Sequence, residues 1–225
     1  MQPVVAKLGG NALGSLPDAL ALGAGGRQLV IVHGGGAQIS ALMRRRGIEP
    51  RFVGGRRFTD LPSLACVRKA LGDVSDELAA AIAATGGRAV PLRLGEVLVG
   101  ERLPELGLVG RIAEVDVAPL RAAWAAGGVP LIAPLARDGS GERYLNVNAD
   151  DVAAAVAAAV GAEELVFLSD VPGVLAGDGT VIAEISASSP PAVSGGMLPK
   201  LAACGAAVAG GVGRVRIGAG TVVTA

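Results

Sequence analysis

The chain has 225 residues, of which 51% are hydrophobic and only 2% aromatic, so alanine, valine, leucine and isoleucine must build its core. Twenty basic residues balance twenty acidic ones without a basic stripe, which excludes the usual electrostatic surface of a nucleic-acid-binding protein. Cys66, Cys204 and a single histidine provide neither a disulfide framework nor a metal-site spacing. With no signal-peptide core and no membrane-spanning apolar run, we expect a soluble cytoplasmic protein, without membrane or nucleic-acid partners, that acts on a small molecule.

Short apolar runs rich in β-branched residues alternate with helical patterns along the chain. In chain order they predict strands at 2–8 and 28–33, a helix at 37–47, a hairpin at 51–59, a helix to 84, strands at 89–94, 96–100 and 108–115, a helix to 126, a strand at 129–135, an alanine-rich helix to about 160, a strand at 164–169, a helix at 198–209 and a last strand at 214–218. Asp60 and Asp116 are expected to cap the helices that follow them. This alternation predicts a three-layer α/β/α sandwich with a mostly parallel central sheet.

Glycines follow two of the predicted strands at the edge where open α/β sheets bind their ligands. Gly9 and Gly10 follow the first strand, and three glycines at 34–36 follow the second. Glycine N–H groups ahead of a helix can approach a phosphate, although each turn alone could be a simple tight connection. The chain has no G-x-x-x-x-G-K-[ST] motif and no G-x-G-x-x-G after a strand, which argues against a P-loop or dinucleotide fold.

Lysine is rare in this chain, which has three lysines among its twenty basic residues. Lys69 lies on a predicted helix face, where a solvated charge is ordinary. Lys7 ends the first strand beside two glycines, and Lys200 lies at the start of a helix. Arginine is bulkier and places its charge differently, so we expect these two positions to need a compact ammonium group.

Six motifs in this order resemble those of the amino acid kinase family, and within it the acetylglutamate kinases. They are KLGGNAL from Lys7, VIVHGGGAQIS from Val30, GRRFTD from Gly55, LGLVGRIAEVD from Leu106, YLNVNADDVAAAVAAAVGAEELVFLSDVPGVL from Tyr144 and GGMLPKLAAC from Gly195. The resemblance implies the amino acid kinase type of α/β/α sandwich. Within it, residues 1–143 would form an N-terminal lobe for the acylamino acid and for dimerisation. Residues 144–225 would form a nucleotide-binding C-terminal lobe on the same continuous sheet.

The resemblance also implies ATP-dependent phosphorylation of the side-chain carboxylate of N-acetyl-L-glutamate to an acyl phosphate, in arginine biosynthesis. Mg²⁺ would be carried by ATP, without protein ligands of its own. Because a carboxylate is already ionised at neutral pH, the acceptor needs no general base. The enzyme must mainly position two anions and neutralise charge on the transferred phosphoryl group.

By the same resemblance, Lys7 and Lys200 flank the phosphoryl group and Asp150 holds both lysines. The residues expected to bind the substrate are Arg57, through the α-carboxylate, Asn146, Gly34 and Gly35. The residues expected to bind phosphate or nucleotide are Gly9, Gly10, Gly36, Ser169 and Asp170. All five glycines would act through their backbone N–H groups.

Several neighbours of these motifs are given ordinary structural roles. Arg56 is interpreted as a solvated charge, Asp151 as a first-turn acid that the helix dipole favours, and Asn148 as a turn residue. Without the other motifs, the polar cluster at 146–151 could be no more than a helix N-cap. His33 is interpreted as structural, and both cysteines and Trp124 as packing residues.

The chain departs from the family pattern in a short segment between residues 10 and 30 and in a compressed C-terminus. Only Met1, Gln2 and Pro3 precede the apolar residues that lead to Lys7, which leaves no room for the N-terminal helix of arginine-inhibited, hexameric members. We therefore expect a homodimer that arginine does not inhibit. Two alternatives are open: a sister kinase acting on carrier-protein-linked aminoadipate or glutamate, and a non-catalytic amino-acid sensor on the same fold.

Overall fold

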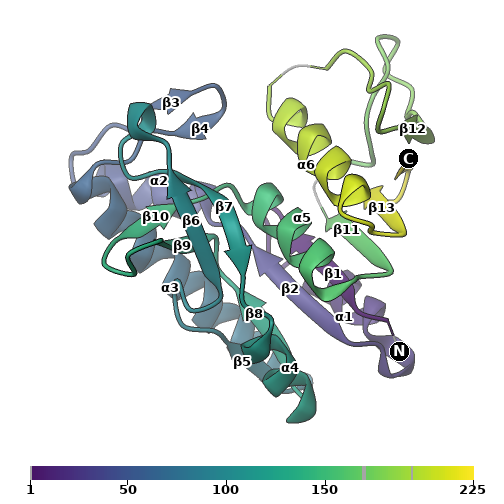
Figure 1. The fold of residues 1–225 in the computed structure, drawn as a ribbon, viewed down its shortest axis with the longest axis horizontal. Coiled ribbons are helices and arrows are strands. Elements are labelled where there is room, and N and C mark those ends of the chain that lie inside the picture. The colour runs from purple at the N-terminus through teal and green to yellow at the C-terminus, as the bar shows by residue number, and fades with distance from the viewer. Residues whose placement is uncertain (1, 169–170, 194) are drawn as a thin grey trace.

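A computed structural model describes residues 2–168, 171–193 and 195–225. Its central sheet runs through the whole molecule (Figure 1). In spatial order the eight strands are β12 (Glu184–Ser186), β14 (Thr221–Thr224), β13 (Arg214–Ile217), β11 (Glu164–Leu168), β1 (Val4–Leu8), β2 (Leu29–His33), β8 (Val129–Ile132) and β5 (Ala89–Pro91). Neighbouring strands pair in parallel except β13 and β14, which are antiparallel.

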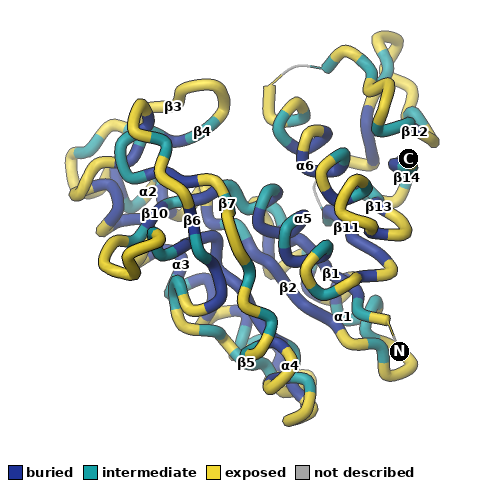
Figure 2. Tube along the Cα trace, viewed as in Figure 1, coloured by how far each residue is buried: buried dark blue, intermediate teal, exposed yellow. Residues whose placement is uncertain are grey.

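Helices cover both faces of this sheet. They are α1 (Leu16–Leu22), α2 (Gly36–Arg45), α3 (Leu61–Ala84), α4 (Ala118–Ala125), α5 (Ala149–Val160) and α6 (Met197–Ala209), with short 3₁₀ turns at Ala24–Gly26 and Pro104–Leu106. Strand residues alternate between the two faces. Ala6 and Leu8 of β1 pack in a cluster with residues of α1 and α3, whereas Val5 packs in the cluster that contains α5 and α6. The predicted three-layer α/β/α sandwich is therefore confirmed, and its inner strands are buried (Figure 2).

A second, smaller sheet lies beside the N-terminal half of the central one. Its strands are β10 (Tyr144–Asn146), β9 (Leu135–Asp138), β6 (Leu98–Arg102) and β7 (Gly110–Val115). The strand predicted at 129–135 is wrong as one element, because β8 belongs to the central sheet and β9 to the second sheet. Pro134 lies at the break, where its missing N–H cannot continue a ladder.

The predicted hairpin at 51–59 is confirmed as β3 (Phe52–Val53) and β4 (Arg56–Arg57). Asp60 caps α3 as predicted, and its Oδ1 accepts a hydrogen bond from Ser63 N. Asp116 is one residue further from its helix than predicted: Val117 occupies the N-cap position, although Asp116 Oδ1 still accepts from Ala118 N. The strand predicted at 214–218 is not the last, because β14 follows it, and α1 and β12 were not predicted.

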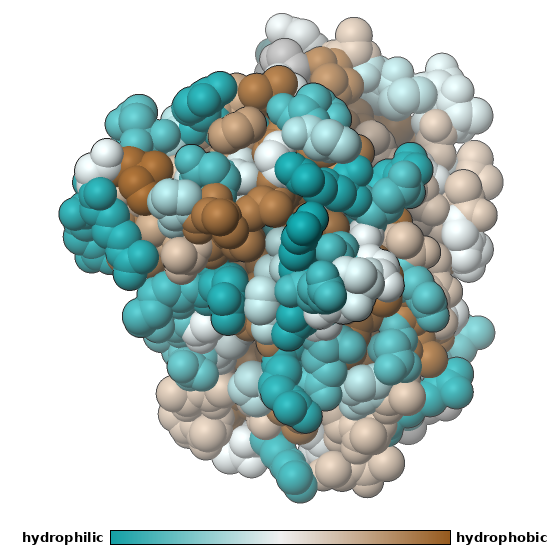
Figure 3. Space-filling model, turned by 60° about the vertical axis from the view of Figure 1, so that its left-hand side comes forward, coloured by the Kyte–Doolittle hydropathy of each residue, from teal (hydrophilic) through white to brown (hydrophobic). Residues whose placement is uncertain are grey.

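The face drawn in Figure 3 carries many hydrophilic side chains, with hydrophobic side chains in separate patches. None of the helices in the described part of the chain has both the length and the apolar character needed to cross a membrane.

Candidate active site

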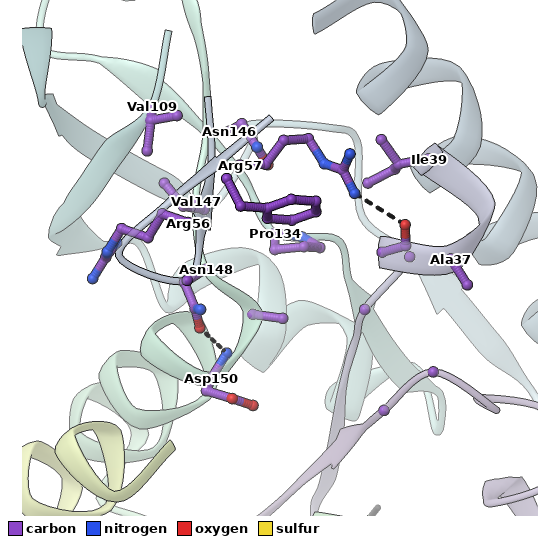
Figure 4. A pocket seen from close by; sticks show the side chains of 18 of the residues that line it. Ala37, Ile39, Arg56, Arg57, Val109, Pro134, Asn146, Val147, Asn148 and Asp150 are labelled. Atoms are coloured by element: carbon purple, nitrogen blue, oxygen red, sulfur yellow. Dashed lines mark hydrogen bonds between the residues drawn. The ribbon is translucent and has the colours of Figure 1, made fainter. Parts of the chain in front are cut away.

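A cavity of about 280 Å³ opens at the carboxyl ends of β1 and β2 (Figure 4). Its walls come from the loops after these strands, from the β3–β4 hairpin and from the junction between β10 and α5. Predicted site residues that line it are Lys7, Gly9, Gly10, Gly34, Gly35, Gly36, Arg57, Asn146 and Asp150. Residues from positions 7 to 150 therefore converge on one cavity at the edge where α/β sheets bind ligands.

Two lysines share one carboxylate at the edge of this cavity. Lys7 Nζ lies 2.7 Å from Asp150 Oδ1, and Lys200 Nζ lies 3.1 Å and 3.2 Å from the two Asp150 oxygens. Lys7 lies two residues after Val5 on β1, so its side chain points to the same sheet face, which α5 and α6 cover. All three residues are at most 9% exposed. The predicted contact of Asp150 with both lysines is thus present in the structure.

Within this cluster, the attraction between opposite charges offsets the cost of burying the ionised groups. Burial alone would raise the pKa of Asp150, but the two ammonium groups outweigh it and hold the pKa below its ordinary value. Burial lowers the pKa of Lys200, and the like charge of Lys7 adds to this effect, while Asp150 opposes it. With all three groups ionised, the cluster carries one unbalanced positive charge.

The polar cluster ahead of α5 caps that helix. Asn148 is the N-cap residue, and its Oδ1 accepts hydrogen bonds from the N–H groups of Asp150 at 2.7 Å and Asp151 at 3.2 Å (Figure 4). The interpretation of Asn148 as a plain turn residue is therefore wrong. Its cap fixes the backbone of the residue that holds both lysines.

Arg56 is ion-paired, which makes its interpretation as a solvated charge wrong. Its Nη2 lies 2.7 Å from Asp151 Oδ2, so the pair connects the β3–β4 hairpin to the first turn of α5. Burial raises the pKa of Asp151, and Arg56 offsets part of this increase. Asp151 is in the first turn as predicted, but its main partner is a side chain from a distant segment.

Arg57 reaches from the hairpin to the start of α2 (Figure 4). Its Nη2 donates to Gly36 O at 3.1 Å and to Ser40 Oγ at 2.8 Å, and its guanidinium lies 4.7 Å from the centre of the Phe52 ring. Burial and the charge of Arg44 lower the pKa of Arg57. Within the described residues no carboxylate lies within ion-pair distance of this buried cation, so the cavity has an unmatched positive charge for an anionic ligand.

The glycines differ in which backbone donors are available. Gly9 N donates to Leu168 O at 3.1 Å, and Gly34 N donates to Leu8 O at 3.0 Å. The expectation that all five glycines act on a ligand through their N–H groups is therefore not met by Gly9 and Gly34, whose N–H groups extend the sheet. Within the described residues, the N–H groups of Gly10, Gly35 and Gly36 make no hydrogen bond and remain available to a ligand.

A model of the amino acid kinase family matches residues 2–219. The chain belongs to the amino acid kinase family. It is 41% identical to the acetylglutamate kinase of Koribacter versatilis, in an alignment that covers 95% of this chain and 89% of that protein. It is 40% identical to the acetylglutamate kinase of Acidobacterium capsulatum, with the same coverage.

Solved structures have the same fold. The crystal structure of smu.665 from Streptococcus mutans superposes with a TM-score of 0.90 at 30% identity and 98% coverage of both chains. The carbamate kinase of Giardia lamblia shares the fold alone, with a TM-score of 0.71 at 16% identity, over 99% of this chain and 98% of that one. Membership of the amino acid kinase family implies that the chain uses ATP.

Some residues of this amino acid kinase site were missed at the sequence level. Thr59 is fully buried behind the cavity, where its Oγ1 accepts a hydrogen bond from Asn146 Nδ2 at 3.0 Å. Ser75 Oγ lies 2.7 Å from Nε2 of the buried His33. Threonine and serine carry no distinguishing signal inside a strand or helix pattern, so only the contacts identify them. The predicted Ser169 and Asp170 lie outside the described residues.

Proposed function

We propose that the chain is an acetylglutamate kinase, which transfers the γ-phosphoryl group of ATP to the side-chain carboxylate of N-acetyl-L-glutamate in arginine biosynthesis. The observation that carries the proposal is the pair of buried lysines on Asp150, beside a cavity that also contains the unmatched Arg57. The relatives with that name support it. The two cationic centres suit a ligand with two carboxylates.

Lys7 and Lys200 neutralise charge that spreads over the transferred phosphoryl oxygens. Asp150 positions both ammonium groups and takes no proton, because its pKa is low and its oxygens are occupied. The N–H groups of Gly10, Gly35 and Gly36 complete the anion site. The attacking carboxylate is ionised already, so no residue has to remove a proton from it.

Arg57 binds the α-carboxylate of the substrate, and Asn146 binds its amide. This assignment places the acylamino acid in the cavity, at the small end of the range for ligand pockets, so the nucleotide must extend beyond it. We propose that the nucleotide lies along the 144–225 lobe, near Ser169 and Asp170.

We propose that Mg²⁺ arrives with ATP. No three histidine, cysteine or acidic side chains in the described parts of the chain are grouped so that they could hold a metal ion. Asp150 is committed to two lysines. The phosphate oxygens of ATP are the hard ligands that Mg²⁺ prefers, and the ion neutralises phosphate charge there.

An ADP-release assay tests the proposal, with the acyl phosphate trapped by hydroxylamine. Acetylglutamate should support turnover, whereas glutamate, aspartate, carbamate and UMP should not. Turnover with another acceptor alone would contradict the assignment, and turnover only with carrier-linked aminoadipate or glutamate would identify the sister kinase. A non-catalytic sensor would release no ADP with any acceptor.

The homodimer and the insensitivity to arginine stay predictions. Light scattering should give twice the chain mass of 22.1 kDa, with dimerisation through the 1–143 lobe. An arginine titration in the ADP-release assay checks the second prediction, and saturable inhibition would contradict it.

A further inference from the structure

We propose that Thr59 is a positioning residue that fixes the side-chain amide of Asn146 with its oxygen toward the substrate. The site then selects acylamino acids whose amide nitrogen still carries a hydrogen atom. This inference rests on the proposed function and names the group by which the site recognises its substrate.

The backbone of Thr59 is held on both sides. Thr59 N donates to Leu106 O at 3.1 Å, and Leu108 N donates to Thr59 O at 2.6 Å. Asn146 N in turn donates to Leu108 O at 2.9 Å, so the segment at 108 bridges Thr59 and Asn146. Gly107 has φ of +80°, and a side chain there would lie 2.4 Å from Thr59 O. Thr59 is therefore fixed in position before any ligand binds.

The hydrogen atoms of this network determine the orientation of the Asn146 amide. The hydroxyl of Thr59 has one proton, which it donates to Arg57 O at 3.0 Å. Its oxygen can then only accept from Asn146, so the Nδ2 of Asn146 faces Thr59 at 3.0 Å. The flipped amide would place two acceptors against each other without a proton.

The carbonyl oxygen of Asn146 remains as a free acceptor. Among the described residues no donor reaches Oδ1, and Asn146 lines the cavity on the same side as Arg57 (Figure 4). An acylamino acid carries a carboxylate and an amide N–H on the same carbon atom. Its carboxylate matches the Arg57 guanidinium, and its N–H matches Asn146 Oδ1. Thr59 contacts both Arg57 and Asn146, so one hydroxyl sets the spacing between the two subsites.

An ester analogue isolates the contribution of the N–H group. In 2-acetoxyglutarate an oxygen replaces the amide nitrogen, so two acceptors would face each other at Asn146. An unpaired acceptor in a dry site weakens binding by about tenfold or more. The wild-type protein should therefore prefer N-acetylglutamate over 2-acetoxyglutarate by at least about tenfold, both in calorimetric binding and in kcat/KM.

Thr59→Val keeps the shape but removes the hydroxyl, so the Asn146 amide can rotate and the preference should fall close to one. Thr59→Ser keeps the hydroxyl and should retain the preference. The KM for ATP should stay unchanged in both variants. Asn146→Leu removes the acceptor itself and should abolish the preference for N-acetylglutamate, as Thr59→Val does. Combining Thr59→Val with Asn146→Leu should cause no further loss of that preference.

Equal binding of the two compounds by the wild-type protein would overturn the inference, as would a full preference in Thr59→Val or Asn146→Leu. These binding measurements do not depend on turnover. Selective binding of N-acetylglutamate without ADP release would instead contradict the proposed kinase activity and leave the role of Thr59 supported.

Discussion

Two ammonium groups and one carboxylate meet at the site, and all three residues are buried. An isolated buried charge is costly, but Asp150 lies within 3.2 Å of both lysines and makes the cluster tolerable. The balance is incomplete, because two positive charges face one negative charge. A transferring phosphoryl group supplies the missing negative charge, and the cluster is therefore better matched to the reacting complex than to the empty site.

Lys7→Arg and Lys200→Arg should each lower kcat by about hundredfold or more, because the charge is kept but its position against the phosphoryl oxygens changes. The melting temperature should change little. Lys69→Arg is the matched control, since Lys69 lies exposed on α3 and pairs with Asp73. ADP-release kinetics and circular dichroism check the result, and normal turnover in either site variant would remove that lysine from the proposed mechanism.

His33 should make the stability depend on pH near neutrality. It is fully buried, its ring lies 2.9 Å from Gly34 O and 2.7 Å from Ser75 Oγ, and burial lowers its pKa, although the Gly34 hydrogen bond opposes this. Below the ordinary pKa of about 6.5 the unfolded chain binds a proton that the folded chain does not. The free energy of unfolding should therefore fall with pH below this value, by at most about 1.4 kcal/mol per pH unit.

Urea unfolding at pH 7.5 and 5.5 measures this effect, and His33→Asn is the comparison because the chain has no other histidine. Asp151, whose pKa burial raises, should instead increase the free energy of unfolding as the pH falls, and it does so in both proteins. This contribution cancels when the pH dependence of the variant is subtracted from that of the wild type. An equal loss of stability in wild type and variant would show that His33 is not the group responsible.

At the scale of elements, the start of α5 holds the site together. Asn148→Ala removes the acceptor for two N–H groups and should lower the free energy of unfolding by about 1 kcal/mol. It should also lower kcat, because the backbone of Asp150 is no longer fixed. Asn148→Ser keeps a capping oxygen and should retain most of both properties. Chemical denaturation and ADP-release kinetics measure the two effects, and an unchanged Asn148→Ala variant would contradict the role of the cap.

The elements that could be predicted from sequence are those with a strong local pattern. The buried strands β1 and β2 and the long helix α3 have such patterns, and the structure confirms them. The three-residue strand β12 and the break at Pro134 depend on which sheet receives each segment, which local periodicity does not encode.

The same distinction applies to the site. Ordered motifs located the lysines, Asp150 and Arg57, but not their other partners. The Arg56–Asp151 pair joins residues 95 positions apart, and Asn146 meets Thr59 across 87 positions. Contacts of this kind follow from the packing of β4, β10 and α5. They leave no spacing signal in a single sequence.

At the scale of the whole molecule, one sheet connects the two proposed lobes. β1, from the 1–143 lobe, pairs with β11, from the 144–225 lobe, along five residues in parallel register. The Lys7–Asp150 ion pair crosses the same boundary, whereas the Lys200–Asp150 pair lies within the 144–225 lobe. Separating the lobes would therefore expose the middle of the core and break a buried charge cluster, instead of opening a polar domain interface.

We predict that the protein unfolds in one cooperative transition. Trp124, the only tryptophan in the sequence, lies in α4 and donates to Leu29 O at 2.9 Å, so its fluorescence reports on the 1–143 lobe. Far-UV circular dichroism reports on helices of both lobes, and the two probes should give the same midpoint. N-acetylglutamate at about 100 times its Kd should stabilise this single transition by about 2.7 kcal/mol, because a ligand that binds only the folded state stabilises everything that unfolds with it. Two separated midpoints, with the ligand shifting only the fluorescence transition, would show that the lobes unfold independently despite the shared sheet.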